Sequence, residues 1–267
     1  MRTIAPYIKN KLVDPAVLSV DEGGNFVIPL LSGHIGGANG FAKALAKVIK
    51  ATPVVTTATD VNKLFAVDEW AARNNMIINS MKAAKDFAAA LVDGQEVGLF
   101  TDYPIISALP RQIVLKDKGV TGLAITKNRN VKPFDATVQL WPRNIYLGIG
   151  CRRGTTLESI ETLVLPKLKE LGIDLRTIVG VASVDLKKDE AGLLDFVAKY
   201  DWEISFFTAE ELQNAAGEFS SSDFVKSVVG VSNVCERSAV LAANNGSIIS
   251  SKCSFNGVTL ALSLIHI

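Results

Sequence analysis

Residues Leu30 to Asp68 read LLSGHIGGANGFAKALAKVIKATPVVTTATDVNKLFAVD, and the order of elements in this segment predicts the fold class. A β-rich run, Phe26 to Leu31, leads into a turn with three glycines. Apolar residues then recur at helical spacing, at Phe41, Ala42, Leu45, Ala46 and Ile49. Pro53 to Thr57 is a second β-rich run. This strand, turn, helix, strand order predicts an α/β fold with a largely parallel sheet.

The glycine turn is the first candidate site. Glycines in such a turn leave amide N–H groups uncovered next to the positive end of the following helix. We therefore predict that a ligand is bound by Ser32, Gly33, Gly36, Gly37 and Asn39. His34 is the one histidine outside the C-terminal tail, and imidazole titrates near neutral pH, which makes it a candidate acid or base. The alternative is a tight structural turn in which His34 bonds a backbone carbonyl.

A threonine-rich turn follows the second strand. If the two strands are parallel, this turn shares a sheet edge with the glycine turn, and ligands of open α/β sheets bind along that edge. Thr57 and Thr59 are predicted to donate hydrogen bonds to a ligand, and Asp60 is a candidate base or a helix cap. Asp68 and Glu69 open the next predicted helix, where acidic residues favour the dipole, so we expect them to be solvated or capping.

The same alternation restarts in the second half of the chain. The pattern weakens between Tyr103 and Asn144, where four prolines fall, and this part is predicted to hold a strand or two and a linker. We place a domain boundary near Pro142, which gives an N-terminal and central α/β region over residues 1–142 and a C-terminal α/β domain over residues 143–267.

A second candidate site follows the strand at Ile145 to Ile149. Gly150, Arg152 and Arg153 precede a predicted helix, and guanidinium groups pair bidentately with carboxylates and phosphates. An anion clamp or a structural turn with solvated arginines fits this sequence. Cys151 is either a nucleophile or a small buried residue, and the latter is favoured because no second histidine lies nearby. Glu236 is a further acid or base candidate, or an ordinary polar residue at a helix start.

Composition excludes several classes of protein. Lys plus Arg number 28 against 27 Asp plus Glu, so no overall field favours nucleic acid or a membrane surface. Three widely separated cysteines fit neither a disulfide framework nor a CxxC metal site, and no signal peptide or membrane span is evident. We therefore expect the protein in the cytosol. Neither a P-loop ending nor GxGxxG spacing is present, which disfavours a nucleotide-dependent enzyme.

Several motifs together resemble one family. LLSGHIGGAN, PVVTTATDVN and FAVDEWA in the first half, with YLGIGCRRGT, GVASVDLKKDE and VGVSNVCERSAVLAA in the second, resemble the cobalt-precorrin-5A hydrolases of anaerobic cobalamin biosynthesis. Members of that family usually carry a further N-terminal segment before the IAP stretch. The resemblance therefore implies two α/β domains of which the N-terminal one is truncated.

The resemblance also implies a reaction. Water opens the δ-lactone of cobalt-precorrin-5A, and the former bridging carbon leaves with its methyl group as acetaldehyde, giving cobalt-precorrin-5B. On this basis His34 is the expected base or proton shuttle, the Gly36 and Gly37 amides stabilise the oxyanion, and Asp60 orients or replaces His34. Arg152 and Arg153 hold peripheral carboxylates, and Glu236 is a second acid or base.

Cofactors and partners are expected to be few. Cobalt arrives in the substrate, so no protein metal site and no other cofactor are expected. Neighbouring enzymes of the cobalamin pathway and a second copy of the chain in a homodimer are the candidate protein partners. The competing hypothesis is a non-catalytic protein that binds the corrinoid and hands it to the next enzyme.

Overall fold

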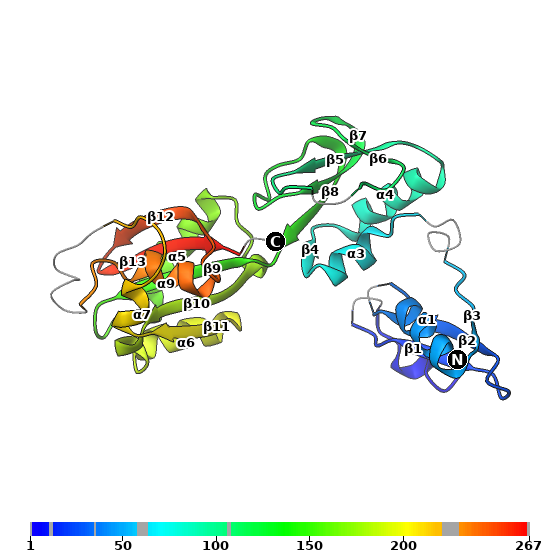
Figure 1. Cartoon of the computed structure of the whole chain (residues 1–267), viewed down its shortest axis with the longest axis horizontal. Coiled ribbons are helices and arrows are strands. Elements are labelled where there is room, and N and C mark those ends of the chain that lie inside the picture. The colour runs from blue at the N-terminus through cyan, green and yellow to red at the C-terminus, as the bar shows by residue number, and fades with distance from the viewer. Residues whose placement is uncertain are drawn as a thin grey trace. The chain divides into compact units, whose positions relative to one another are not determined.

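The chain divides into two compact units, which we call unit 1 and unit 2. The structure is a computed structural model (Figure 1) that describes residues 2–10, 13–34, 36–57, 64–105, 108–220 and 230–265. Unit 1 comprises Met1–Thr126 and Val131–Trp141, and unit 2 comprises Lys127–Asn130 and Pro142–Ile267. Among the described residues, no helix is long and apolar enough to cross a membrane.

Unit 1 begins with a short 3-10 helix, η1 (Ala5–Tyr7), and a three-stranded sheet in the order β1-β2-β3. β1 (Val17–Val20) is antiparallel to β2 (Phe26–Leu31), and β2 is parallel to β3 (Thr52–Pro53). The helix α1 (Ala38–Ile49) packs Ala42 and Ala46 on Val27. The predicted strand and helix are confirmed, whereas the second strand is shorter than expected because Val54 to Thr57 lie outside the strand.

A second sheet of unit 1 has the strand order β4-β8-β7-β5-β6, in which β8, β7, β5 and β6 run parallel. Helices α3 (Val67–Arg73) and α4 (Met81–Val92) share a hydrophobic core with this sheet. In that core, Phe87 and Leu91 of α4 pack with Val138 and Leu140. Its strands are β4 (Met76–Ile78), β5 (Val97–Thr101), β6 (Ile113–Leu115), β7 (Gly119–Ile125) and β8 (Phe134–Pro142).

The prediction for residues 103–144 was wrong, because this region supplies three strands of the second sheet. Its prolines flank the strands: Pro133 directly precedes β8, and Pro142 is its last residue. Gly98 and Gly122 leave room for the Phe134 ring, since an added Cβ would lie 2.2 Å and 2.4 Å from it. The strands are thus stabilised by a contact between distant residues, which local periodicity does not reveal.

Unit 2 contains one five-stranded sheet in the order β11-β10-β9-β13-β12. The first three strands are parallel, and β13 and then β12 are added antiparallel to them. The strands are β9 (Ile145–Cys151), β10 (Ile178–Val184), β11 (Glu203–Phe207), β12 (Ser247–Phe255) and β13 (Val258–Leu264). The helices are α5 (Leu157–Glu170), η2 (Leu175–Thr177), η3 (Asp185–Lys187), α6 (Ala191–Tyr200), α7 (Ala209–Gln213) and α9 (Cys235–Ala242).

Helices cover both faces of the unit 2 sheet (Figure 1). Ile145, Leu147 and Ile149 of β9 point to a core shared with α5 and α6. Gly148 points to the opposite face, because successive strand residues alternate. A Cβ on Gly148 would lie 1.8 Å from the carbonyl oxygen of Cys235, so α9 packs directly on the β9 backbone. This layering confirms the predicted α/β class with largely parallel sheets.

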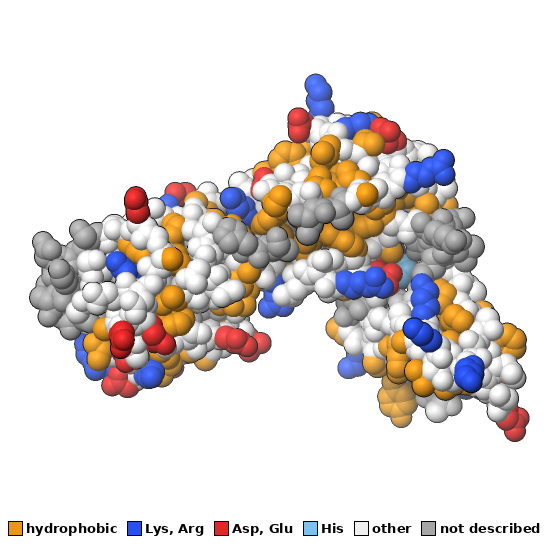
Figure 2. All heavy atoms as spheres, in the orientation of Figure 1, with side chains coloured by type: hydrophobic (Ala, Val, Ile, Leu, Met, Phe, Trp, Pro, Cys, Tyr) orange, Lys and Arg blue, Asp and Glu red, His pale blue; other side chains and the backbone are white. Residues whose placement is uncertain are grey.

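Some apolar side chains remain at the surface. Over the sheet of unit 1 that contains β6 and β7, hydrophobic side chains lie exposed in Figure 2. Leu115 and Val120 are 61% and 74% exposed. Folded proteins commonly expose apolar residues of this kind, so these side chains do not by themselves indicate a binding surface.

Candidate functional site

The glycine turn between β2 and α1 is held together by its own backbone. The Ala38 amide donates to the Ser32 carbonyl at 3.0 Å, and the Asn39 amide donates to the Gly33 carbonyl at 2.9 Å. The Ser32 hydroxyl donates to the Asp14 carbonyl at 2.7 Å. Ser32 itself has a φ of 56°, in the left-handed region. The predicted ligand-binding hydroxyl of Ser32 is therefore a structural donor.

Two glycines of the turn are required by close packing. A Cβ on Gly36 would lie 2.3 Å from the Ser32 Cβ, and one on Gly33 would lie 2.7 Å from Oδ1 of Asn39. The Gly37 amide donates to the His34 carbonyl at 2.9 Å. This bond corrects the prediction that Gly37 stabilises an oxyanion. The Gly36 amide has no hydrogen-bond partner in the part of the chain that the structure describes.

His34 forms a pair with Asp68. Its Nδ1 lies 3.2 Å from Oδ2 of Asp68, and the two side chains are 19% and 18% exposed. The other carboxylate oxygen, Oδ1, accepts the Glu69 amide at 3.0 Å. With the carboxylate ionised, Nδ1 carries the hydrogen, and Nε2 becomes the basic nitrogen. The pair therefore has the geometry of a general base oriented by a carboxylate.

Burial acts to raise the pKa of the Asp68 carboxyl, but the opposing contacts are stronger. The hydrogen bond and charge of His34, together with the Glu69 amide, hold this pKa below its ordinary value of 3.8. Asp68 is consequently ionised at neutral pH and lies at the first turn of α3.

Asp68 replaces the partner that the sequence suggested for His34. We predicted Asp60 for this role, but Asp60 and Thr59 lie outside the described residues. Asp68 was expected to be solvated or capping. One of its oxygens does accept an amide of the first turn of α3, but the other pairs with His34. No local signal links His34 to Asp68, because they are 34 positions apart and meet only through the fold.

The threonine turn adjoins the glycine turn, as predicted from parallel strands. Nδ2 of Asn39 donates to Oγ1 of Thr57 at 3.2 Å, and β2 and β3 are parallel. Asn39 is only 2% exposed. The amide therefore ties the two turns together, which corrects its assignment as a residue that faces a ligand.

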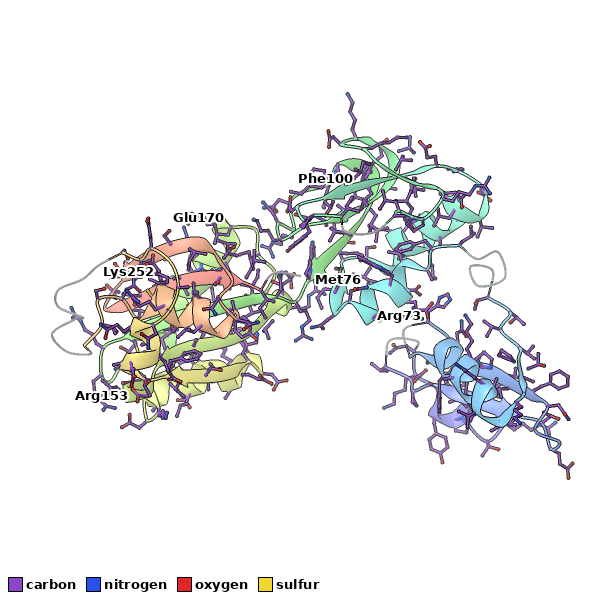
Figure 3. All side chains as sticks on the ribbon, in the orientation of Figure 1. Arg73, Met76, Phe100, Arg153, Glu170 and Lys252 are labelled. Carbon is purple, nitrogen blue, oxygen red and sulfur yellow. The ribbon has the colours of Figure 1, made fainter. Side chains whose placement is uncertain are left out.

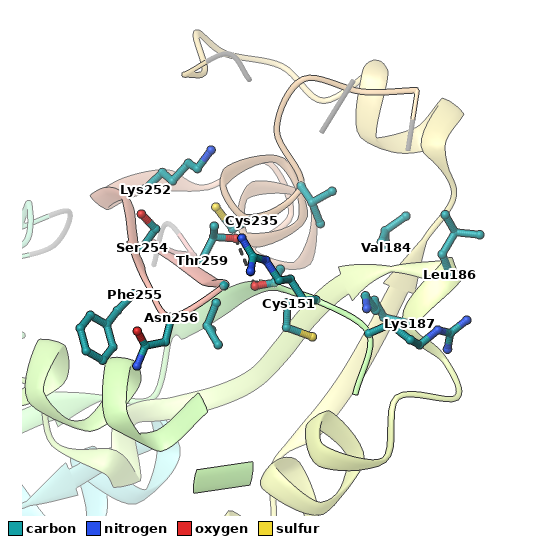
Figure 4. Close-up of a pocket in the computed structure, with 16 residues that line it drawn as sticks. Cys151, Val184, Leu186, Lys187, Cys235, Lys252, Ser254, Phe255, Asn256 and Thr259 are labelled. Carbon is teal, nitrogen blue, oxygen red and sulfur yellow. Dashed lines mark hydrogen bonds between the residues drawn. The ribbon is translucent and has the colours of Figure 1, made fainter. Parts of the chain in front are cut away.

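Unit 2 holds a cavity of about 870 Å³ at the carboxyl ends of β9 and β10 (Figure 4). Lys252, Ser254, Phe255 and Asn256 line one side in this view, and Val184, Leu186 and Lys187 line the other. This is the edge at which open α/β sheets bind ligands.

The cavity wall is basic. It carries Arg152, Arg153, Lys187 and Lys252, and no Asp or Glu lines it among the described residues. The Arg153 guanidinium contacts Asp189 at 2.6 Å, and the Lys187 ammonium contacts Glu190 at 2.9 Å. Figure 3 shows that Arg153 and Lys252 come from separate elements of unit 2. The predicted residues Gly150, Arg152 and Arg153 thus lie together, and Lys252 joins them.

Glycines shape this cavity. Gly257 has a φ of 81°, and a Cβ there would lie 2.8 Å from Cδ of Arg152. The Arg152 amide donates to the Gly257 carbonyl at 3.1 Å. At Gly150, the carbonyl accepts the Thr259 hydroxyl at 3.2 Å. Gly257 is therefore needed for the Arg152 side chain to cross the turn between β12 and β13.

The cysteines at the cavity are neutral thiols. Burial raises the pKa of Cys151 above its ordinary value of 9.0, and it raises the pKa of Cys235 to about 11. A thiol is nucleophilic only as thiolate. Cys151 is accordingly a small, partly buried wall residue.

Glu236 has a structural role in this fold. It is 4% exposed and does not line the cavity. Its carboxylate accepts hydrogen bonds from the Ser220 amide at 2.9 Å, the Asn233 side chain at 2.6 Å and the Lys252 amide at 2.7 Å. These bonds correct its assignment as an acid or base. The spacing of Asn233 and Glu236 was the available signal, because the Asn233 side chain accepts the Glu236 amide at 2.9 Å at the start of α9.

Comparison with known proteins identifies the family. Models described as cobalamin synthesis G N-terminal, cobalamin biosynthesis central region and cobalamin synthesis G C-terminus match residues 1–60, 65–142 and 145–263. The chain is 34% identical over 279 residues to a cobalt-precorrin-5A hydrolase of Salmonella typhimurium, covering 100% of this chain and 79% of that protein. The chain belongs to the cobalt-precorrin-5A hydrolase family.

A second cobalt-precorrin-5A hydrolase, from Priestia megaterium, is 31% identical over 283 residues, covering 99% of this chain and 75% of that protein. The family resemblance found in the sequence is confirmed. The three matched segments assign the glycine turn to the N-terminal segment of the family, Asp68 to the central segment, and the basic cavity to the C-terminal segment.

Within the described ranges, no group of three or more His, Cys, Asp or Glu side chains is placed to hold a metal ion.

Proposed function

We propose that this chain hydrolyses cobalt-precorrin-5A to cobalt-precorrin-5B and releases acetaldehyde. The observation that carries the proposal is the His34–Asp68 pair beside the glycine turn, in a chain of the cobalt-precorrin-5A hydrolase family. Cobalt belongs to the substrate in this proposal, and the protein needs no resident metal or other cofactor. Neighbouring enzymes of the pathway and a second copy of the chain are the proposed protein partners.

The first step uses His34 as general base. Nε2 takes a proton from water as the water oxygen adds to the lactone carbonyl, and the Asp68 carboxylate stabilises the imidazolium that forms. The carbonyl oxygen becomes an oxyanion, for which the Gly36 amide is the proposed donor. Collapse of this intermediate breaks the acyl–oxygen bond and gives a carboxylate and a hydroxyl group.

The second step releases acetaldehyde. The hydroxyl group now sits on the former bridging carbon, and its proton passes to a base as the oxygen forms a carbonyl. The carbon–carbon bond to the macrocycle breaks, and its electron pair remains with the conjugated ring, which is protonated. The sum is one water consumed and one acetaldehyde released, so no oxidant or reductant is required.

The test is anaerobic incubation of the purified chain with cobalt-precorrin-5A, with acetaldehyde measured by NADH oxidation through alcohol dehydrogenase. We expect release from the wild-type chain and a loss of about 100-fold or more for His34→Ala, which is the usual contribution of a general base. Normal release from His34→Ala would remove the proposed role of His34. Tight corrinoid binding without release from the wild-type chain would instead favour a binding or handover protein.

A further inference from the structure

We infer that the unit 2 cavity is a binding site for a flat, apolar macrocycle with peripheral carboxylates, and that Lys252 and Arg152 are its specificity-determining cations. The identity of this ligand as the corrinoid rests on the proposed function. The cavity itself indicates an apolar ligand with at least two negative charges.

The charges of the cavity point to carboxylates. Two of its four cations already have acidic partners, Asp189 for Arg153 and Glu190 for Lys187. Neither the Arg152 guanidinium nor the Lys252 ammonium has an acidic partner within the described residues. Two uncompensated cations on one concave wall favour a ligand that brings at least two negative charges.

Both cations are fixed through their backbones. The Lys252 amide donates to the buried Glu236 carboxylate at 2.7 Å, and the Arg152 amide donates to the Gly257 carbonyl at 3.1 Å. Lys252 lies on β12, and Arg152 follows β9. Because the backbone on each side is set before a ligand binds, the site loses little backbone conformational entropy on binding.

The remainder of the cavity is apolar enough for a ring. Val184 and Leu186 lie opposite Phe255 across it (Figure 4). Its volume of about 870 Å³ falls near the upper end of the range of about 300–1,000 Å³ for small-molecule sites. A small inorganic anion would leave these apolar walls unused, whereas a macrocycle fringed with carboxylates uses both the walls and the cations.

The experiment measures binding of two cobalt corrinoids to the full chain by tryptophan-fluorescence quenching. Cobyrinic acid has free peripheral carboxylates, and in cobinamide those groups are amides. We expect cobyrinic acid to bind more tightly than cobinamide, and we expect Lys252→Gln and Arg152→Gln each to weaken cobyrinic acid binding about tenfold, as loss of a charge-assisted hydrogen bond would. We expect neither substitution to change the Kd for cobinamide by more than about twofold.

Lys169→Gln is the matched control, because Lys169 is exposed on α5 and does not line the cavity. Thermal denaturation of each variant checks folding, and both tested substitutions keep the backbone amides that hold the wall. Equal binding of the two corrinoids, or loss of affinity in Lys169→Gln as large as in Lys252→Gln, would overturn the inference. Inorganic phosphate competing as well as cobyrinic acid would also overturn it.

Acetaldehyde release separates this inference from the proposed function. Release by the wild-type chain with cobyrinic acid binding unaffected by either substitution would remove the cavity site and leave the hydrolase. Charge-dependent corrinoid binding without release from the wild-type chain would retain the cavity site and remove the hydrolase.

Discussion

Replacing Asp68 with Asn tests how His34, the proposed general base, is oriented. The change is nearly isosteric, so the amide oxygen can still accept the Nδ1 hydrogen of His34, but the negative charge is lost. Asp68 is a positioning residue in this hypothesis, because it acts on the substrate through His34. We therefore expect slower acetaldehyde release with little change in KM.

The magnitude follows from the geometry of the pair. For the 3.2 Å between Nδ1 and Oδ2, unit charges interact by roughly 1.3 kcal/mol in bulk water and roughly 5 kcal/mol at a dielectric constant of about 20. Both side chains are about one-fifth exposed, and the imidazolium is only partly formed in the transition state. We expect a loss of about 2 kcal/mol, which is about 30-fold in kcat.

The assay is coupled acetaldehyde release measured across pH. Loss of the carboxylate destabilises the imidazolium, so the acidic limb of the kcat/KM profile should move to lower pH in Asp68→Asn. The pKa of Asp68 lies below 3.8, so the stability that this ionised carboxylate contributes is present above that pH and is lost only as the pH falls through the lower folded value. Near neutral pH the wild-type carboxylate is therefore ionised throughout the assay.

Glu69→Gln is the matched control, since Glu69 lies on the same helix and pairs with Arg73. We expect its rate to stay within twofold of wild type. An Asp68→Asn variant with a rate within threefold of wild type and an unchanged pH profile would refute the reasoning, because a purely structural contact would leave both unaltered.

Three further predictions concern unit 2. Glu236→Ala leaves buried hydrogen-bond donors unpaired, which costs about 1–3 kcal/mol for each donor. We therefore expect urea denaturation to show a loss of about 3 kcal/mol in the free energy of unfolding. A loss below about 1 kcal/mol would contradict a structural role for these bonds. With its pKa raised to about 11, Cys235 should be the slowest cysteine to react with iodoacetamide at pH 8 by mass spectrometry, and labelling as fast as that of Cys253 would contradict this. Burial and Glu161 raise the pKa of Tyr200 to about 12, so its stabilising contribution is complete below pH 10 and is lost as the pH rises toward 12. Between pH 9 and 11, the urea midpoint of unfolding should fall less in Tyr200→Phe than in wild type. An equal fall in both proteins would show that Tyr200 does not make this pH-dependent contribution to stability.

Local sequence patterns predicted the elements that depend on neighbouring residues. The β2 run, the glycine turn and the apolar spacing of α1 lie within a short stretch, so hydrophobic periodicity and glycine placement predicted them correctly. The nearness of the glycine and threonine turns was also anticipated, because parallel strands bring their carboxyl ends to one edge, but the bond between Asn39 and Thr57 was not. Several motifs in order indicated the family, which the comparisons confirm.

Charged side chains were harder to interpret. Glu236 and Asp68 are both acidic residues near helix starts. The sequence left Glu236 as an acid–base candidate or an ordinary polar residue, and it indicated a solvated or capping role for Asp68. The fold buries Glu236 among donors and brings Asp68 to His34. A carboxylate's role depends on the groups that surround it, and those groups come from distant parts of the chain.

The α/β class and the family can be inferred from the amino-acid sequence alone. The pairing of His34 with Asp68, the three strands within residues 103–144, and the meeting of Lys252 with Arg152 at one cavity are visible only in the folded chain. The physical reason is the range of the interactions. Helix and turn preferences act between residues a few positions apart, whereas ion pairs and strand pairing depend on how the chain returns to itself.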